Sequence, residues 1–132
     1  MALAFNTTLR NNMLDQITAL IDADAGAGEI RIYNGARPAT GGVVTTLLAT
    51  LPFGVTSFPA AASGTMTANA ITDETSATAG TATWFRVVDN SGDFVMDGDV
   101  GTSGSDLNLN TTTIGAGGTV QVTSFVLNAP NA

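Results

Sequence analysis

The sequence predicts a mainly β protein, an antiparallel β-sandwich of the jelly-roll or immunoglobulin-like type with one amphipathic α-helix at its N-terminus. Three observations lead to this fold class. The chain holds 21 threonines and 15 glycines, and threonine suits a half-buried pleated surface. About six short apolar runs follow one another with glycine-rich turns between them. Helical periodicity is confined to the first part of the chain.

A chain of 132 residues has the length of one domain. We therefore expect a single domain over residues 1–132. Within it, residues 1–25 form the helix and a linker, and residues 26–132 form the sandwich.

Apolar residues at every fourth position predict the helix over residues 7–22. These residues are Leu9, Met13, Ile17 and Ile21, with Leu14 and Leu20 widening the stripe. The N-terminus is capped by one of three polar residues at positions 6–8. We expect the apolar stripe to pack either on the sandwich or on a neighbouring molecule, and the opposite, polar face to carry Arg10, Asn11, Asn12, Asp15, Gln16 and Thr18.

Three strands are expected in the first half of the chain. Residues 29–33 alternate, with Ile30 and Ile32 facing inward, and end at the turn dipeptide Asn34-Gly35. A second strand near residues 46–51 ends at a proline. Residues 65–71 alternate again and predict a third strand.

The strongest local pattern is a hairpin of residues 81–88 and 93–100 around a four-residue turn at 89–92. A turn of this length sets the register of the two strands. It pairs Val87 with Phe94, Phe85 with Met96, Trp84 with Asp97, and Val88 with Asp93. The apolar side chains of both strands then share one face.

A second hairpin is expected to lead from residues 107–114 through four residues at 115–118 into residues 120–127. The apolar alternation shifts between Val122 and Phe125. This shift indicates a β-bulge.

The composition excludes most enzyme chemistry. The net charge is −7, all four basic residues are arginines, and lysine, histidine and cysteine are absent. The chain therefore has no imidazole base or metal ligand, no thiol nucleophile and no lysine to form a Schiff base. The sequence therefore predicts a non-enzymatic protein with no cofactor. The acidic charge opposes nucleic-acid binding, and we expect neither a secretory signal nor a membrane segment.

Two acidic stretches and one carboxylate pair are the remaining candidates for chemistry. Residues 22–26 and 89–93 each contain part of a calcium loop, but neither completes its pattern. We expect these aspartates to cap a helix end and a turn. Asp97 and Asp99 project from one strand face, where a solvated acidic surface with Arg86 opposite one of them is expected.

The candidate protein-contact residues are Arg31, Tyr33, Arg37, Trp84 and Arg86. The single tryptophan and the single tyrosine suit an interface anchor or a stacking platform for a sugar. The arginines suit bidentate pairing with carboxylates, within the domain or on a partner. Residues 38–72 and 107–132 contain no charged side chain, so either a partner covers them or their hydroxyl and amide groups supply enough polarity.

Five stretches of the chain stand out as a set. They are residues 31–38 (RIYNGARP), 47–49 (LLA), 67–71 (TANAI), 81–86 (TATWFR) and 100–110 (VGTSGSDLNLN). Together they resemble a family of small structural proteins from tailed bacteriophages and prophages, and the resemblance covers nearly the whole chain.

The resemblance implies a capsid cement or decoration protein. Such a protein binds the major capsid protein on the outer head surface, as a dimer or trimer, and is assembled in the bacterial cytoplasm before it becomes part of the virion. A tail tube, terminator or baseplate component is the closest alternative. A carbohydrate-binding module that displays Trp84 or Tyr33 is a more distant one.

Overall fold

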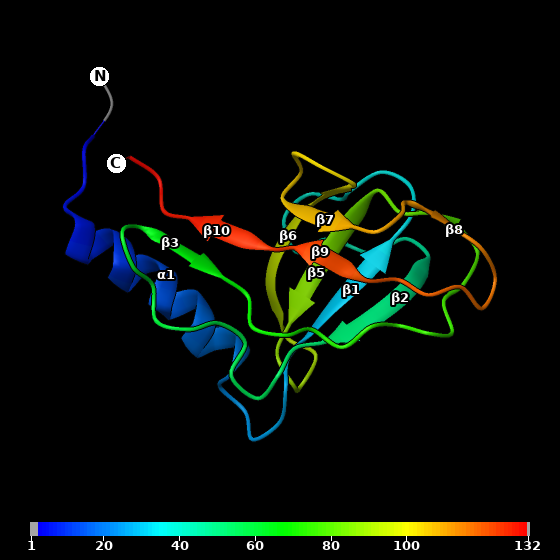
Figure 1. The fold of residues 1–132 in the computed structure, drawn as a ribbon, viewed down its shortest axis with the longest axis horizontal. Helices are drawn as coiled ribbons and strands as arrows, with labels where there is room; N and C mark the ends of the chain where they lie inside the picture. The colour runs from blue at the N-terminus through cyan, green and yellow to red at the C-terminus, as the bar shows by residue number, and fades with distance from the viewer. Residues whose placement is uncertain (1–2, 132) are drawn as a thin grey trace.

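The computed structural model describes residues 3–131, and it shows a β-rich fold with one helix at the N-terminal end (Figure 1). The mainly β class with one N-terminal helix is confirmed. The elements, in chain order, are α1 (Thr7–Ile21), β1 (Glu29–Tyr33), β2 (Leu47–Pro52), β3 (Thr65–Thr67), β4 (Gly80–Thr81), β5 (Trp84–Val88), β6 (Phe94–Gly101), β7 (Leu107–Leu109), β8 (Thr113–Ile114), β9 (Val122–Ser124) and β10 (Val126–Asn128).

One curled, six-stranded sheet takes the place of the two facing sheets that define a sandwich. Its strand order is β2-β1-β5-β6-β7-β9, and β3 with β10 and β4 with β8 form two small sheets. The wholly antiparallel arrangement is wrong at one pair, because β6 and β7 run parallel. The short segment between them folds back on itself, since Asp106 accepts the backbone N–H of Asp99 at 2.9 Å and Asn108 accepts that of Ser105 at 3.1 Å.

The core lies on the inner face of the curled sheet. Ile30 and Ile32 face inward as predicted and are fully buried. The ring of Phe85 lies across Gly98, where a Cβ would come within 2.6 Å of it, so the missing side chain makes room for the ring. Phe125, which follows β9, meets Phe85 edge-on at 5.4 Å and closes the core from the other side.

The register of the β5–β6 hairpin differs from the prediction by two residues over most of its length. Val87 pairs with Met96, Phe85 with Gly98 and Trp84 with Asp99, and a bulge separates these pairs from Val88 with Phe94. The turn is tightened by Asp89, whose carboxylate accepts two backbone N–H groups, and the bulge absorbs the extra residue. Phe94 therefore lies on the face opposite Phe85, which corrects the predicted shared apolar face.

The second hairpin is confirmed in part. β7 and β9 pair antiparallel, and their register shifts at Val122–Ser124, so the predicted bulge is confirmed. Ile114, expected in the same hairpin, instead belongs to β8 and pairs with Gly80 of β4. The predicted strand at residues 65–71 is shorter, because regular pairing ends at Thr67.

Helix α1 has the predicted bounds within one residue, and Asn6 caps it by accepting the N–H of Leu9 at 3.0 Å. Its predicted orientation is wrong in part. Ile17 packs on the core and Leu14 and Ile21 are buried, but Leu9, Met13 and Leu20 are exposed.

Polar side chains dock the helix onto residues 57–64. Asn11 accepts the N–H of Gly64 at 2.8 Å, Asp15 that of Ala61 at 2.9 Å, and Asp22 that of Ser57 at 3.1 Å. These backbone groups form no regular sheet, so they need acceptors from elsewhere. The hydrogen bonds rotate the helix away from the orientation that its apolar stripe alone predicts.

The docking role of Asn11 is testable against its neighbour Asn12, which is exposed. Both alanine variants gain the same helix propensity, but Asn11→Ala also leaves the Gly64 N–H without its acceptor. We expect Asn11→Ala to have a free energy of unfolding about 1–3 kcal/mol below that of Asn12→Ala, measured by urea denaturation. Equal stabilities would contradict the docking role.

Candidate contact surface

Strand pairing gathers four of the five predicted contact residues on the outer face of the sheet, opposite the core. Tyr33 of β1 pairs with Trp84 of β5, and Arg31 pairs with Arg86. Arg37 follows in the segment after β1 and reaches Asp99 of β6 at 3.1 Å. The sequence therefore identified residues that share one face of the fold.

The rings on this face form a continuous stack. Tyr33 and Trp84 lie 4.4 Å apart and almost parallel. The guanidinium of Arg86 lies 5.5 Å from the Trp84 ring on one side and 5.1 Å from the Phe94 ring on the other. Phe94 was not predicted here, because the bulge that turns it to this face leaves no mark in the apolar alternation.

A buried ion pair joins the stack to β6. Arg86 donates to the two carboxylate oxygens of Asp97 at 2.7 and 3.0 Å, and the side chains are only 10% and 3% exposed. The hydrogen bond to Asp97 raises the pKa of Arg86 above its ordinary value, although burial opposes this shift. A raised pKa stabilises the fold below the unfolded-state pKa of arginine, so this stabilisation is fully present at neutral pH.

Residues 34–46, which we call the covering loop, lie on top of this stack. Arg86 donates to the carbonyl of Gly42 at 2.9 Å, and Asp97 accepts the N–H of Gly41 at 3.3 Å. Gly41 has a φ of +71° and lies against the Phe94 ring, a conformation that favours glycine. The ion pair of Arg86 and Asp97 thus holds the middle of the loop from below.

The indole of Trp84 anchors the two ends of the covering loop. Its N–H donates to the carbonyl of Asn34 at 3.1 Å and to the hydroxyl of Thr45 at 3.0 Å. Asn34 also exchanges hydrogen bonds with Thr46 at 3.2 Å through its backbone N–H and its side-chain oxygen. The loop is therefore closed at both ends and supported in its middle.

The covering loop presents apolar side chains to solvent. Val43 is 90% exposed, and Val44 and the adjoining Leu47 of β2 are also exposed. We call these three residues the loop patch. Arg37 is the exposed charged residue of the same loop.

The predicted contact residues divide into two groups. Tyr33, Trp84 and Arg86 are buried, so in this fold they support the surface and do not form it. Neither aromatic ring is available as a stacking platform for a sugar, because the covering loop folds back over them. Arg31 is half-buried and pairs with Glu29, and Arg37 is exposed, so a partner-contact role for these two stays a prediction.

The carboxylates singled out in the sequence are engaged within the chain. Arg86 pairs with Asp97, as expected for one of the two strand aspartates, and Arg37 pairs with Asp99. The expected solvated acidic face is wrong for Asp97, whose side chain is buried. Asp89 caps its turn as predicted. Residues 3–131 contain no cluster of three or more acidic, histidine or cysteine side chains arranged to hold a metal.

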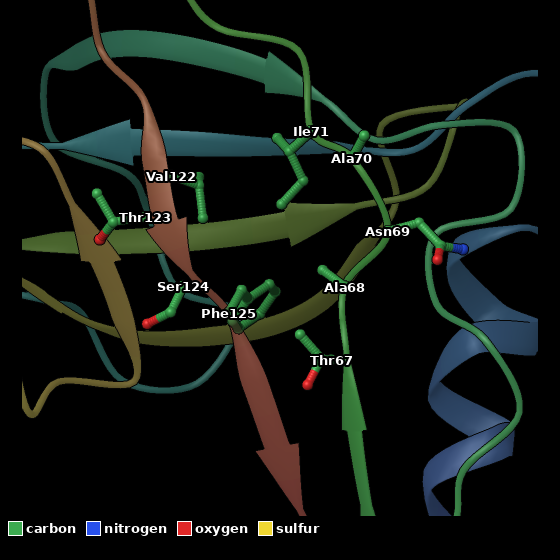
Figure 2. Close-up of a pocket in the computed structure, with 9 residues that line it drawn as sticks. All are labelled: Thr67, Ala68, Asn69, Ala70, Ile71, Val122, Thr123, Ser124 and Phe125. Atoms are coloured by element: carbon green, nitrogen blue, oxygen red, sulfur yellow. The ribbon is translucent and has the colours of Figure 1, made fainter.

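A groove of about 230 Å³ lies between the segment after β3 and strand β9 (Figure 2). Its lining carries no charged or titratable side chain and consists of Thr67, Ala68, Asn69, Ala70, Ile71, Val122, Thr123, Ser124 and Phe125. Such a lining offers dispersion contacts and a few hydrogen bonds. Its hydroxyl groups come from Thr67, Thr123 and Ser124, and none of the nine lining residues is a carboxylate or an imidazole that could act as their general base.

Comparison with known protein families, with curated proteins and with solved structures finds no match to this chain. Within residues 3–131, no helix combines the length and the apolar character needed to cross a membrane.

The ion pair of Arg86 and Asp97 can be tested against the exposed pair of Arg37 and Asp99. Asp97→Ala leaves a buried guanidinium without its counter-charge, so we expect a loss of about 3–5 kcal/mol in the free energy of unfolding. Asp99→Ala breaks an exposed pair and should cost at most about 1 kcal/mol. Guanidinium chloride denaturation of both variants checks this, and a cost for Asp97→Ala no larger than that for Asp99→Ala would contradict the supporting role of the buried pair.

Proposed function

We propose that this protein is a non-enzymatic structural component of a bacteriophage virion. It acts as a capsid cement or decoration protein that binds the major capsid protein on the outer head surface. The observation that carries the proposal is the loop patch, an exposed apolar surface held over the buried side chains of Trp84 and Arg86. The bacteriophage assignment itself rests on the resemblance of the sequence motifs.

A supported loop suits a protein whose function is to bind. An interface gains affinity when its contact residues are ordered before binding, because less conformational entropy is lost. Val43 and Val44 offer apolar area, and complete burial of a valine side chain contributes about 1.5–3 kcal/mol. Binding to the assembled shell then stabilises that shell by mass action.

The remaining surface agrees with a virion component that is present in many copies. The net charge of −7 favours solubility and opposes non-specific aggregation. The chain carries no histidine, lysine or cysteine to supply common catalytic groups. A carbohydrate-binding module is disfavoured, because Trp84 and Tyr33 are buried beneath the covering loop.

The loop patch is tested with two exposed valines as a matched pair. Val43 lies in the patch and Val55, which is 77% exposed, lies outside it. We expect Val43→Asp to weaken co-sedimentation with phage heads that lack this protein by about tenfold or more, because the substitution removes buried apolar area and places a charge in the interface. Val55→Asp should bind like the unchanged protein. Equal binding by both variants would contradict the role of the patch.

The position in the virion is tested by cryo-electron microscopy of the parent phage. A cement protein predicts density over the joints between capsid subunits, in hundreds of copies per head, as icosahedral repetition requires. A ring of few copies on the tail axis would overturn the cement proposal in favour of a tail component.

A further inference from the structure

Helix α1 exposes a face without charge. The exposed fraction of Leu9 is 47%, that of Met13 is 37% and that of Leu20 is 58%. None of the exposed residues of the helix is ionisable: they are Thr7, Thr8, Leu9, Asn12, Met13, Gln16, Ala19 and Leu20. A surface helix usually turns charged residues to water and apolar residues inward. This helix exposes apolar side chains where charged ones are usual.

The charged residues at the helix are occupied by the body of the protein. Arg10 donates to the carbonyl of Ala129 at 3.1 Å, and the carboxylates of Asp15 and Asp22 accept backbone N–H groups of residues 57–61. The same interactions that dock the helix therefore leave its outer face neutral. We call the residues Leu9, Met13, Gln16 and Leu20 the helix stripe.

The residues of the helix stripe are spaced symmetrically along the helix. Its members follow one another at intervals of four, three and four residues, the spacing at which one helix packs along another. The pattern reads the same in both directions, with its centre between positions 14 and 15. A two-fold axis at that centre places Leu9 against Leu20 of a second copy and Met13 against Gln16 of that copy.

We propose that the occupant of this face is a second copy of the same chain, docked as an antiparallel, two-fold symmetric helix pair. The absence of charge on the helix stripe, on a protein that is otherwise acidic, favours a second copy as its partner. Elsewhere the exposed ionisable side chains comprise one arginine and five aspartates, namely Arg37, Asp24, Asp73, Asp93, Asp99 and Asp106. Two acidic copies repel one another where aspartates meet, and the helix stripe lets them approach without that repulsion.

The size of the face predicts a weak dimer. A helix of 15 residues is about 22 Å long, and one helix pair of this length buries less than the roughly 1,200 Å² of a typical stable complex. We therefore expect dissociation in the range of about 10 µM or above. Copies held side by side on a larger assembly would pair more completely, because their effective concentration is higher. The inference stands without the proposed shell binding, since it uses a different surface.

The pairing is tested by sedimentation equilibrium of the full chain between about 10 µM and 1 mM. The unchanged protein is expected to form dimers over this range. Leu9→Glu and Leu20→Lys each place a charge against an apolar side chain of the second copy, so each should weaken dimerisation at least tenfold. Both substitutions suit the helix dipole, with the acid near the N-terminus and the base near the C-terminus, and thermal unfolding confirms that each variant is folded.

The double variant distinguishes the geometry. In the antiparallel pair, the carboxylate introduced at position 9 meets the ammonium introduced at position 20 of the second copy. Leu9→Glu with Leu20→Lys is therefore expected to restore the dimer, and added salt should weaken this dimer more than that of the unchanged protein. Val55→Glu and Val126→Lys, which change exposed valines outside the helix, should leave dimerisation as it is.

Three results would overturn the proposal. The first is an unchanged protein that remains monomeric at about 1 mM. The second is a double variant that fails to regain the dimer lost in both single variants. The third is a loss of dimer in the two valine controls equal to that in the helix variants. Each of these results is independent of whether the protein binds phage heads, so failure here and failure of the cement proposal are distinguishable.

Discussion

The buried ion pair between Arg86 and Asp97 is the interaction on which the outer half of the molecule depends. It joins β5 to β6, it fills the space between the Trp84 and Phe94 rings, and it reaches the backbone of the covering loop at Gly41 and Gly42. Removing a charged group from water costs free energy, and this cost is offset only where a counter-charge and hydrogen-bond partners surround the group. The guanidinium here has a carboxylate, a carbonyl and two rings, so the loop and the sheet are held as one unit.

The sequence predicts the parts of this fold that depend on local patterns. The alternation around Ile30 and Ile32 and the bulge after Val122 lie where residue type and spacing place them, and the cap is Asn6, one of its three candidates. The orientation of α1 was missed because acceptors such as Asn11 serve backbone groups more than 40 residues away. The hairpin register, and with it the place of Phe94, was missed because the bulge at Val95 leaves no mark in the apolar alternation.

The side of the sheet on which the candidate residues lie was predictable from the sequence, but their burial beneath the covering loop was not. Strand parity places Tyr33 opposite Ile32, and Trp84 and Arg86 opposite Phe85, but the pairing of β1 with β5 that brings them together was not predicted. Bidentate pairing of an arginine with a carboxylate was predicted and is found at Arg86. Their burial depends on residues 34–46 folding back over them, for which no periodic pattern exists. The predicted residues are therefore buried and support the exposed valines of the loop patch. The helix stripe forms a separate apolar surface on α1.

The covering loop is closed over the outer face of the folded protein, and fluorescence of the single tryptophan reports this closure. Trp84 is fully buried and its indole N–H is bound within the loop. We expect blue-shifted emission with little quenching by acrylamide until the protein unfolds. Emission typical of tryptophan in water, with strong quenching under native conditions, would show that the loop is open and that it does not cover the outer face.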